Sequence, residues 1–169
     1  MAEPTKAGNG GDSKPPVGDA QQVQVRVVAQ YIKDLSFENP NVLKLVGNPG
    51  EAPNLRVDVN VNASKVANNT FESVINFKAE ASNKLGTIYD LELAYAGMFQ
   101  IENMPEASLE PFLLINCPAL LFPFARRLVA DLTREGGFPP LLLDPIDFGT
   151  LYARRMQERS AQAQPKPAN

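Results

Sequence analysis

Two apolar segments, each interrupted by prolines, constrain the fold of this chain more than any other feature. Residues 116–127 (NCPALLFPFARR) join an uncharged run to two arginines, and residues 138–146 (FPPLLLDPI) form a second run. Proline lacks a backbone N–H and disrupts both a helix interior and a central strand. We therefore expect the leucine-rich run to be an extended loop whose apolar side chains need a partner, within this chain or outside it.

Composition favours one domain and limits the classes of partner. The 169 residues, 44% of them hydrophobic, are enough for a single core. A net charge of -3 and a pI near 5.0 disfavour nucleic acid, which is bound mainly through Lys and Arg. The single cysteine excludes an internal disulfide, and neither an export signal nor an uncharged run of ~20 residues is present. We expect a cytoplasmic protein without membrane insertion.

The chain ends are poor in large apolar residues. Residues 1–20 and 160–169 consist mostly of small and polar residues together with Gly and Pro, which bury too little surface to offset ordering entropy. We expect a disordered N-terminal tail at 1–20, a folded domain at 21–159 and a disordered C-terminal tail at 160–169.

Alternating residues predict four strands in sequence. The alternation covers residues 23–32, 54–62, 71–81 and 89–95, with Asn68-Asn69 as a turn between the second and third strands. Four consecutive strands favour an antiparallel sheet.

Two helices follow. Apolar residues at three- and four-residue steps predict a helix that ends at Gly136-Gly137, with its start kinked or segmented by Pro118 and Pro123. Asp147 can cap a last helix with an apolar stripe on one side. The fold class is therefore α+β.

Catalytic and metal-binding patterns are missing from the sequence. There is no histidine, and Cys117 has neither a basic neighbour in sequence nor a second cysteine. No glycine-rich phosphate loop follows a strand. We expect no enzyme, no metal and no cofactor, which leaves a binding protein; a carrier of small apolar ligands is one such class.

Four carboxylates can gather on one outer surface of the sheet. Asp34 and Glu38 share a parity in the continuation of the first strand, and Asp90 and Glu92 share one in the fourth. If these two strands are neighbours, the four side chains lie together. Two interpretations stay open: a solvated face, or a docking surface for a basic protein.

The apolar residues exceed what one four-stranded layer needs. The leucine-rich segments add their side chains to a sheet face already supplied with valines. Either other subunits bury this surplus, or it stays available for ligands.

Three separated segments resemble the bacterial protein-export chaperone family SecB. They are residues 31–40 (YIKDLSFENP), 117–126 (CPALLFPFAR) and 137–148 (GFPPLLLDPIDF), and the similarity covers about 21–157. The resemblance implies a four-stranded antiparallel Greek-key sheet followed by two helices, assembled as a homotetramer, a dimer of dimers.

The resemblance also implies a function and its sites. SecB proteins hold non-native precursor polypeptides in the cytoplasm, without ATP, and pass them to the translocation ATPase SecA. The basic zinc-containing C-terminal segment of SecA would dock on Asp34, Glu38, Asp90 and Glu92. The client-binding groove would draw on Val57, Val59, Leu141, Leu143 and Tyr152. The oligomer interface would include Leu91, Leu93, Tyr95, Phe124 and Leu128.

Overall fold

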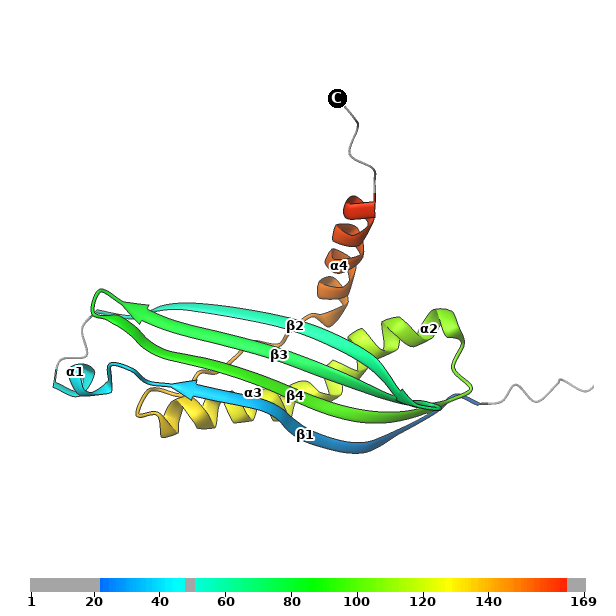
Figure 1. Ribbon diagram of the computed structural model, residues 1–169, viewed down its shortest axis with the longest axis horizontal. Helices are drawn as coiled ribbons and strands as arrows, with labels where there is room; N and C mark the ends of the chain where they lie inside the picture. The colour runs from blue at the N-terminus through cyan, green and yellow to red at the C-terminus, as the bar shows by residue number, and fades with distance from the viewer. Residues whose placement is uncertain (1–21, 48–50, 164–169) are drawn as a thin grey trace, which may run out of the picture.

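The computed structural model describes residues 22–47 and 51–163, which form one sheet with a long helix along one of its faces and a last helix that projects beyond the sheet (Figure 1). The strands are β1 (Gln24–Glu38), β2 (Asn54–Ala67), β3 (Thr70–Asn83) and β4 (Gly86–Glu102). The helices are α1 (Val42–Gly47), α2 (Glu106–Pro111), the π-helix η1 (Phe112–Asn116), α3 (Cys117–Glu135) and α4 (Phe148–Ala163). The residues expected as the N-terminal tail lie outside the described part, whereas α4 runs past the expected boundary at 159.

The four strands are antiparallel in the order β1-β4-β3-β2. Tight turns join β2 to β3 and β3 to β4, and the left-handed residues Asn69 (φ 57°) and Gly86 (φ 117°) supply their positive φ angles. The chain from β1 to β2 passes through α1, so that β1 pairs with β4 and closes a Greek key. The predicted α+β fold class is confirmed.

One face of the sheet packs against α3 and forms the core. Alternate residues of β4 are buried on this inner face, among them Leu91, Leu93 and Phe99. Gly97 lies on the same face, where a Cβ atom would come within 2.6 Å of Leu121 Cδ2. Glycine at this position therefore lets α3 approach the sheet closely. Residues of opposite parity form the outer face.

Two β-bulges change the parity of β1. The register against β4 shifts between Val27 and Ala29 and again between Ile32 and Asp34, which leaves Val28 and Lys33 as the extra residues. Continuous alternation from Val23 to Tyr31 was expected. The bulge at Val28 instead moves Ala29 and Tyr31 to the outer face.

Residues 116–127 lie in the predicted helix, which continues through Pro118 and Pro123. This segment is helical, and α2, η1 and α3 form one continuous helix from Glu106 to Glu135. Buried Cys117, Leu121 and Ala125 recur at four-residue steps, so packing of this face on the sheet outweighs the proline penalty. The extension of this helix back to Glu106 was not predicted from the sequence.

The helix from Glu106 to Glu135 is also long and apolar enough to cross a membrane. The core helix of a soluble protein meets the same criterion of length and composition. In this structure the buried side of the helix lies against the sheet, and the helix itself contains two charged residues, Arg126 and Arg127.

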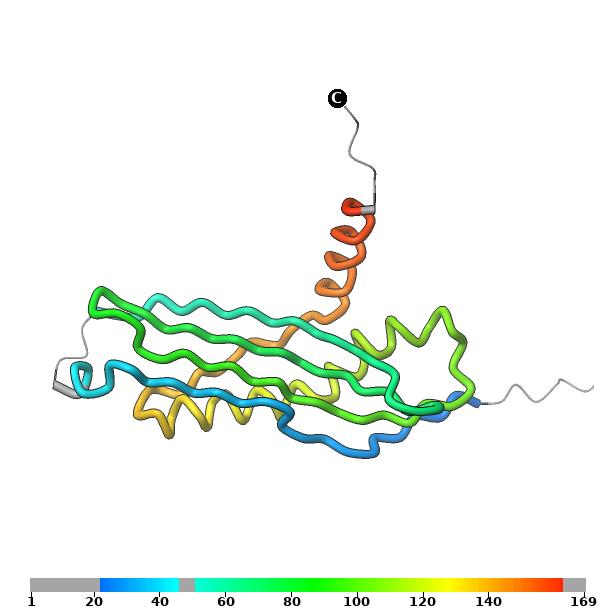
Figure 2. The backbone as a smooth tube through the Cα atoms, viewed as in Figure 1, coloured from blue at the N-terminus to red at the C-terminus, as the bar shows by residue number. Residues whose placement is uncertain are grey.

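The end of α3 and the crossover after it match the sequence prediction. The Gly137 N–H bonds to the carbonyl of Arg134 (3.0 Å) and the Phe138 N–H to that of Thr133 (3.1 Å), with Gly137 at φ 88°. This is a Schellman motif, which stops the helix. Residues 139–147 then form the crossover without regular structure. Figure 2 shows the crossover passing behind the sheet, on the side of the helices, before it reaches α4.

Helix α4 begins at the predicted cap and projects past β2 (Figure 1). Asp147 Oδ1 accepts a hydrogen bond from the Thr150 N–H at 3.0 Å, which lowers the pKa of the carboxyl. Two arginines tie the helix to the rest of the chain. Arg155 donates to the Val61 carbonyl at 2.7 Å, and Arg159 pairs with Glu110 at 2.9 Å.

Candidate binding surfaces

The four carboxylates expected to share an outer surface do lie together. Across β1 and β4, Glu38 is the pairing partner of Asp90, Ser36 that of Glu92, and Asp34 that of Ala94. The α3-facing residues of β4 have the opposite parity, so these carboxylates lie on the outer face. We call Asp34, Glu38, Asp90 and Glu92 the acidic surface. Its geometry is as predicted, and its role remains a proposal.

A lysine that the sequence reading did not single out stands beside this surface. Lys78 of β3 is paired with Glu92 of β4 on one side and with Asp58 of β2 on the other. Its Nζ lies 2.6 Å from Glu92 Oε1 and 3.8 Å from Asp90 Oδ2. The hydrogen bond to Glu92 raises the pKa of Lys78 above its usual value. The acidic surface therefore carries its own partial counter-charge.

A second polar cluster fixes β1 against the outer face. Glu72 accepts hydrogen bonds from Lys33 Nζ (2.6 Å) and from Tyr31 Oη (2.5 Å). The bond from Lys33, followed by that from Tyr31, lowers the pKa of Glu72, although burial opposes the effect. The bond to Glu72, together with burial, raises the pKa of Tyr31 to about 12. Glu72 is thus a buried carboxylate that two donors keep ionised.

An apolar hollow lies at the end of the sheet that carries α1. It encloses about 410 Å³ between α1, the start of β4 and the Schellman turn. Val42, Leu45, Ile88, Tyr89 and Phe138 line it. The Tyr89 and Phe138 rings lie 5.3 Å apart, and burial raises the pKa of Tyr89. We call this the α1 hollow.

Sequence reading missed the α1 hollow because its residues come from four separate segments. The helix α1 is short, and its buried Leu45 gave little periodicity to detect. A usable signal was the pair Val42 and Leu45, apolar at a three-residue step directly after Pro40-Asn41.

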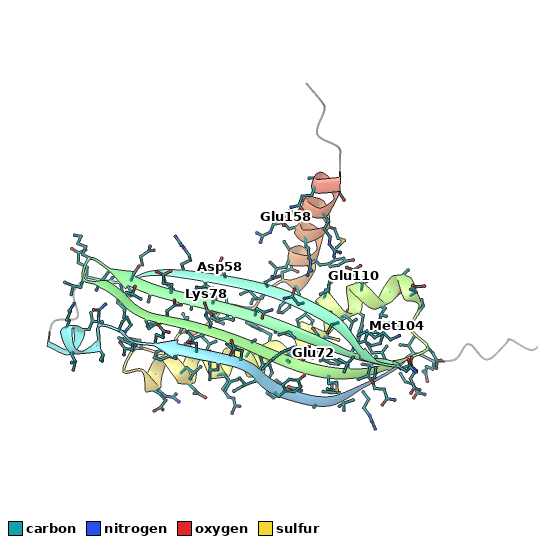
Figure 3. The ribbon with its side chains drawn as sticks, viewed as in Figure 1. Asp58, Glu72, Lys78, Met104, Glu110 and Glu158 are labelled. Atoms are coloured by element: carbon teal, nitrogen blue, oxygen red, sulfur yellow. The ribbon has the colours of Figure 1, made fainter. Side chains whose placement is uncertain are left out.

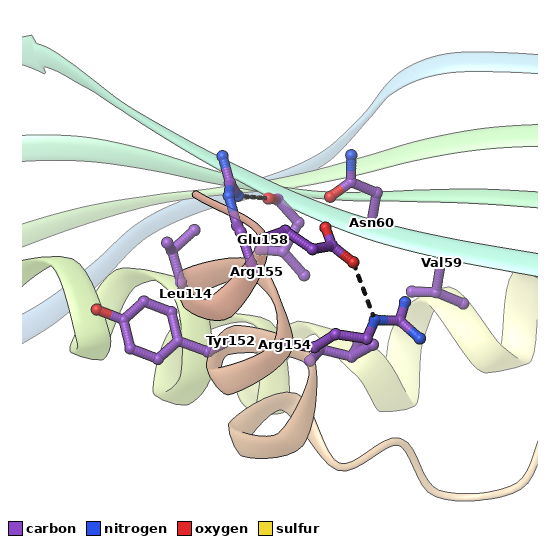
Figure 4. Close-up of a pocket in the computed structure, with 9 residues that line it drawn as sticks. Val59, Asn60, Leu114, Tyr152, Arg154, Arg155 and Glu158 are labelled. Carbon is purple, nitrogen blue, oxygen red and sulfur yellow. Dashed lines mark hydrogen bonds and ion pairs between the residues drawn. The ribbon is translucent and has the colours of Figure 1, made fainter. Parts of the chain in front are cut away.

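A second hollow lies under the first turns of α4 (Figure 4). Its apolar wall contains Val59, Leu114 and Tyr152, whereas its rim is polar. At this rim Arg154 Nε lies 3.7 Å from Glu158 Oε1 in an ion pair. Asn60 of β2 also lines the hollow. We call this the α4 hollow.

The predicted groove residues are divided between these regions. Val59 and Tyr152 line the α4 hollow. Leu141 is partly buried and Leu143 is buried, both against the core. Val57 is exposed on the inner side of β2. These residues do not line one continuous groove in the single chain, so their role in client binding stays a prediction.

The residues expected at an oligomer interface differ in how much surface they offer. Leu91, Leu93 and Tyr95 are already buried under α3. Phe124 is 44% exposed and stacks on Tyr95 at 6.5 Å, and Leu128 is partly exposed. A second subunit could cover Phe124 and Leu128, whereas the three β4 side chains have little exposed surface left to bury.

A further apolar strip remains uncovered along β1. Val25, Val27, Ile32 and Leu35 pair with buried inner-face residues of β4, yet each is at least 40% exposed. Together with Phe124 they form what we call the β1 strip. Such a strip is typical of a surface that another subunit covers.

Cys117 is fully buried in the core, and burial raises the pKa of its thiol to about 12. A thiol so far from ionisation is a poor nucleophile. Cys117 therefore acts as a small buried hydrophobic residue of the core.

Comparison with known proteins completes the description. The model of the family described as preprotein translocase subunit SecB matches residues 18–159. The chain belongs to the SecB family.

Relatives at the sequence level carry the same name. A protein-export protein SecB of Maricaulis maris is 47% identical over 150 residues, which cover 89% of this chain and 87% of that protein. A protein-export protein SecB of Nitrobacter winogradskyi is 48% identical over 158 residues, covering 94% and 98%. The resemblance read from the three sequence segments is confirmed.

A solved structure shows the same fold. The SecB-like chaperone of Mycobacterium tuberculosis, in complex with a peptide from an antitoxin, aligns with a TM-score of 0.58 at 15% identity. The alignment covers 72% of this chain and 90% of that chain. SecB proteins are soluble protein-export chaperones and not enzymes, and this family membership gives the present chain its general role.

Proposed function

We propose that this protein holds non-native precursor polypeptides on its open apolar surfaces, without ATP, and delivers them to SecA in the cytoplasm. The observation that carries the proposal is the α1 hollow, because this chain of the SecB family keeps an apolar cavity with aromatic walls open beside its crossover.

Apolar contact suits clients that share no sequence. The hydrophobic effect is non-directional and scales with area, so any apolar side chain of an unfolded polypeptide can enter the α1 hollow. Full burial of one Leu, Val or Phe contributes about 1.5–3 kcal/mol. The Tyr89 and Phe138 rings supply a broad contact surface, and neither ring carries a charge that would select one client.

The α4 hollow extends the same surface with polar groups. Its apolar wall can take a second side chain, while Arg154 and Asn60 at the rim can bond to the backbone of an extended client. Two hollows on one chain bind separate parts of one long polypeptide, which a compact folded protein does not present.

We further propose that the chain assembles as a homotetramer through the β1 strip and the exposed flank of α3. A second copy of this chain is the occupant that fits, because the strip continues the chain's own core surface: Ile32 is the pairing neighbour of Tyr95, on which Phe124 stacks. Assembly into a dimer of dimers multiplies the hollows on one particle and raises the effective concentration of each next client segment.

The acidic surface is the proposed docking site for SecA. Its carboxylates are exposed or partly exposed on the outer face, whereas the β1 strip lies on the inner face. A basic segment of SecA is attracted there over about a Debye length, ~8–10 Å at physiological salt.

Native mass spectrometry of the full chain, with and without an unfolded precursor, tests the proposal. We expect four copies per particle and a client bound to the tetramer.

Leu141→Arg and Tyr152→Glu should reduce client capture while four copies persist. Val66→Arg, a change at an exposed valine of the distant β2 end, should not reduce client capture. Glu92→Lys should keep the client and lose SecA. Unchanged capture by both variants would remove the α4 hollow and the crossover from the proposed binding surface.

A further inference from the structure

Lys78 occupies the middle of the outer face, next to the acidic surface. Figure 3 shows it on β3 beside Asp58 of β2. In register, Lys78 lies between Asp58 of β2 and Glu92 of β4. Its ammonium group lies on the β4 side, 2.6 Å from Glu92 and 3.8 Å from Asp90. The lysine therefore sits where a basic group of a docking partner would bind.

The pair is open enough to be exchanged. The side chains of Lys78 and Glu92 are 47% and 52% exposed. Ion pairs this exposed are weak, so an incoming cation can displace Lys78 from Glu92. Asp58, on the other side of Lys78, offers the displaced ammonium a second carboxylate in the same row of the sheet.

Other basic residues of this face have different partners. Lys33 bonds to Glu72. Arg56 is paired in register with Glu80, on the far side of β3 from the acidic surface. Among the described residues, the ion pairs of Asp90 and Glu92 are formed with Lys78.

We infer that Lys78 is an internal counter-cation that competes with SecA for the acidic surface and sets how basic a docking segment must be. The inference rests on the docking role proposed above. A single positive group of a partner would only exchange with Lys78 on Glu92. A segment that also reaches Asp34 and Glu38 gains net attraction, so weakly basic chains are rejected.

Substitution of the lysine tests the competition. Lys78→Met keeps most of the aliphatic stem and removes the charge. Binding of a zinc-loaded peptide of the SecA C-terminal segment would be measured by titration calorimetry at low and physiological salt. We expect roughly three- to tenfold tighter binding at low salt, since one like charge at 4 Å opposes binding by about 1 kcal/mol in water. The gain should shrink at higher salt.

Matched variants separate competition from other effects. Lys84→Met removes a lysine with a similar ion pair, 2.7 Å to Glu51, outside the acidic surface, and should leave the affinity unchanged. In a Glu92→Gln background the gain from Lys78→Met should fall, because the lysine acts through that carboxylate. Lys78→Gln repeats the test if the methionine variant folds poorly.

Two failures have different meanings. If the unchanged protein does not bind the peptide and Glu92→Gln has no effect, the docking surface itself is wrong and the inference falls with it. If Glu92→Gln weakens binding but a folded Lys78→Met or Lys78→Gln variant binds as the unchanged protein does, or more weakly, only the competition is overturned.

Discussion

The Ser73 hydroxyl of β3 donates a hydrogen bond to the Leu113 carbonyl across 2.9 Å, in the buried contact between sheet and helix. The Cys117 N–H bonds to the Phe112 carbonyl, five residues back. With the same five-residue spacing, the Leu113 carbonyl would accept a hydrogen bond from the N–H of residue 118, but residue 118 is a proline and has no N–H. Ser73 supplies the donor that Pro118 lacks, and the helix continues through its prolines.

Ser73→Ala should therefore destabilise the fold. The substitution leaves the Leu113 carbonyl buried without its donor, which costs about 1–3 kcal/mol. Chemical denaturation followed by circular dichroism measures the loss. Ser108→Ala, at an exposed serine of α2, serves as the control and should stay within about 0.5 kcal/mol of the unchanged protein. Equal stability of the two variants would contradict this account of the helix.

Thr133 should position the crossover. Its Oγ1 donates to the Val129 carbonyl at 3.0 Å and accepts the Leu141 N–H at 2.9 Å. Thr133→Val keeps the shape but removes both bonds, so we expect a loss of about 1–2 kcal/mol. Hydrogen exchange at the Leu141 amide should accelerate more than exchange in β3. Protection at Leu141 equal to that in the unchanged protein would show that other contacts hold the crossover.

The Glu72 cluster predicts stability that depends on pH at both ends. The pKa of Glu72 is lowered by folding, so its contribution is present above the ordinary value of 4.5 and is lost as pH falls through the lower folded pKa. The pKa of Tyr31 is raised from 10.0 to about 12, so its contribution is present below pH 10 and is lost as pH rises toward 12.

Glu72→Gln and Tyr31→Phe separate the two limits. Unfolding free energies measured from pH 3 to 11 should show about 1–3 kcal/mol lost at neutral pH for Glu72→Gln. Relative to the unchanged protein, the acid slope should flatten in Glu72→Gln and the alkaline slope in Tyr31→Phe. Slopes unaffected by either change would mean that other groups control the pH response.

We predict that a single charge placed in the β1 strip dissociates the oligomer. Phe124→Glu or Ile32→Glu places a carboxylate where a second copy would bury an apolar side chain. Losing about 1.5–3 kcal/mol from each of two symmetric copies weakens a dimer roughly a hundredfold or more. Sedimentation velocity should show smaller species, whereas Val66→Glu, at an equally exposed site on the β2 end, should sediment as the unchanged protein.

The outer face was predictable because strand alternation fixes it. Asp34 and Glu38 share one parity, Asp90 and Glu92 share another, and the observed register, in which Glu38 pairs with Asp90, places both pairs on the outer face. The two bulges of β1 were not predictable, since one extra residue leaves the local pattern unchanged while it exchanges the faces.

The helical region and the α1 hollow needed the tertiary structure. Proline at 118 and 123 argues locally against a helix, and only the buried stripe on the sheet, with the donor from Ser73, outweighs that preference. The α1 hollow combines Val42, Tyr89 and Phe138 from distant segments, which no local pattern links.

The most direct test of the account compares one precursor in its unfolded and its folded form. Equilibrium affinities would be measured for both forms with the full chain and with a Phe138→Asp variant, whose charge enters the α1 hollow. We predict that the unfolded form binds at micromolar concentration or tighter, that the folded form does not bind, and that the variant loses at least tenfold. Equal affinity for both forms, or a folded variant that binds the unfolded form as tightly as the unchanged protein does, would contradict the account.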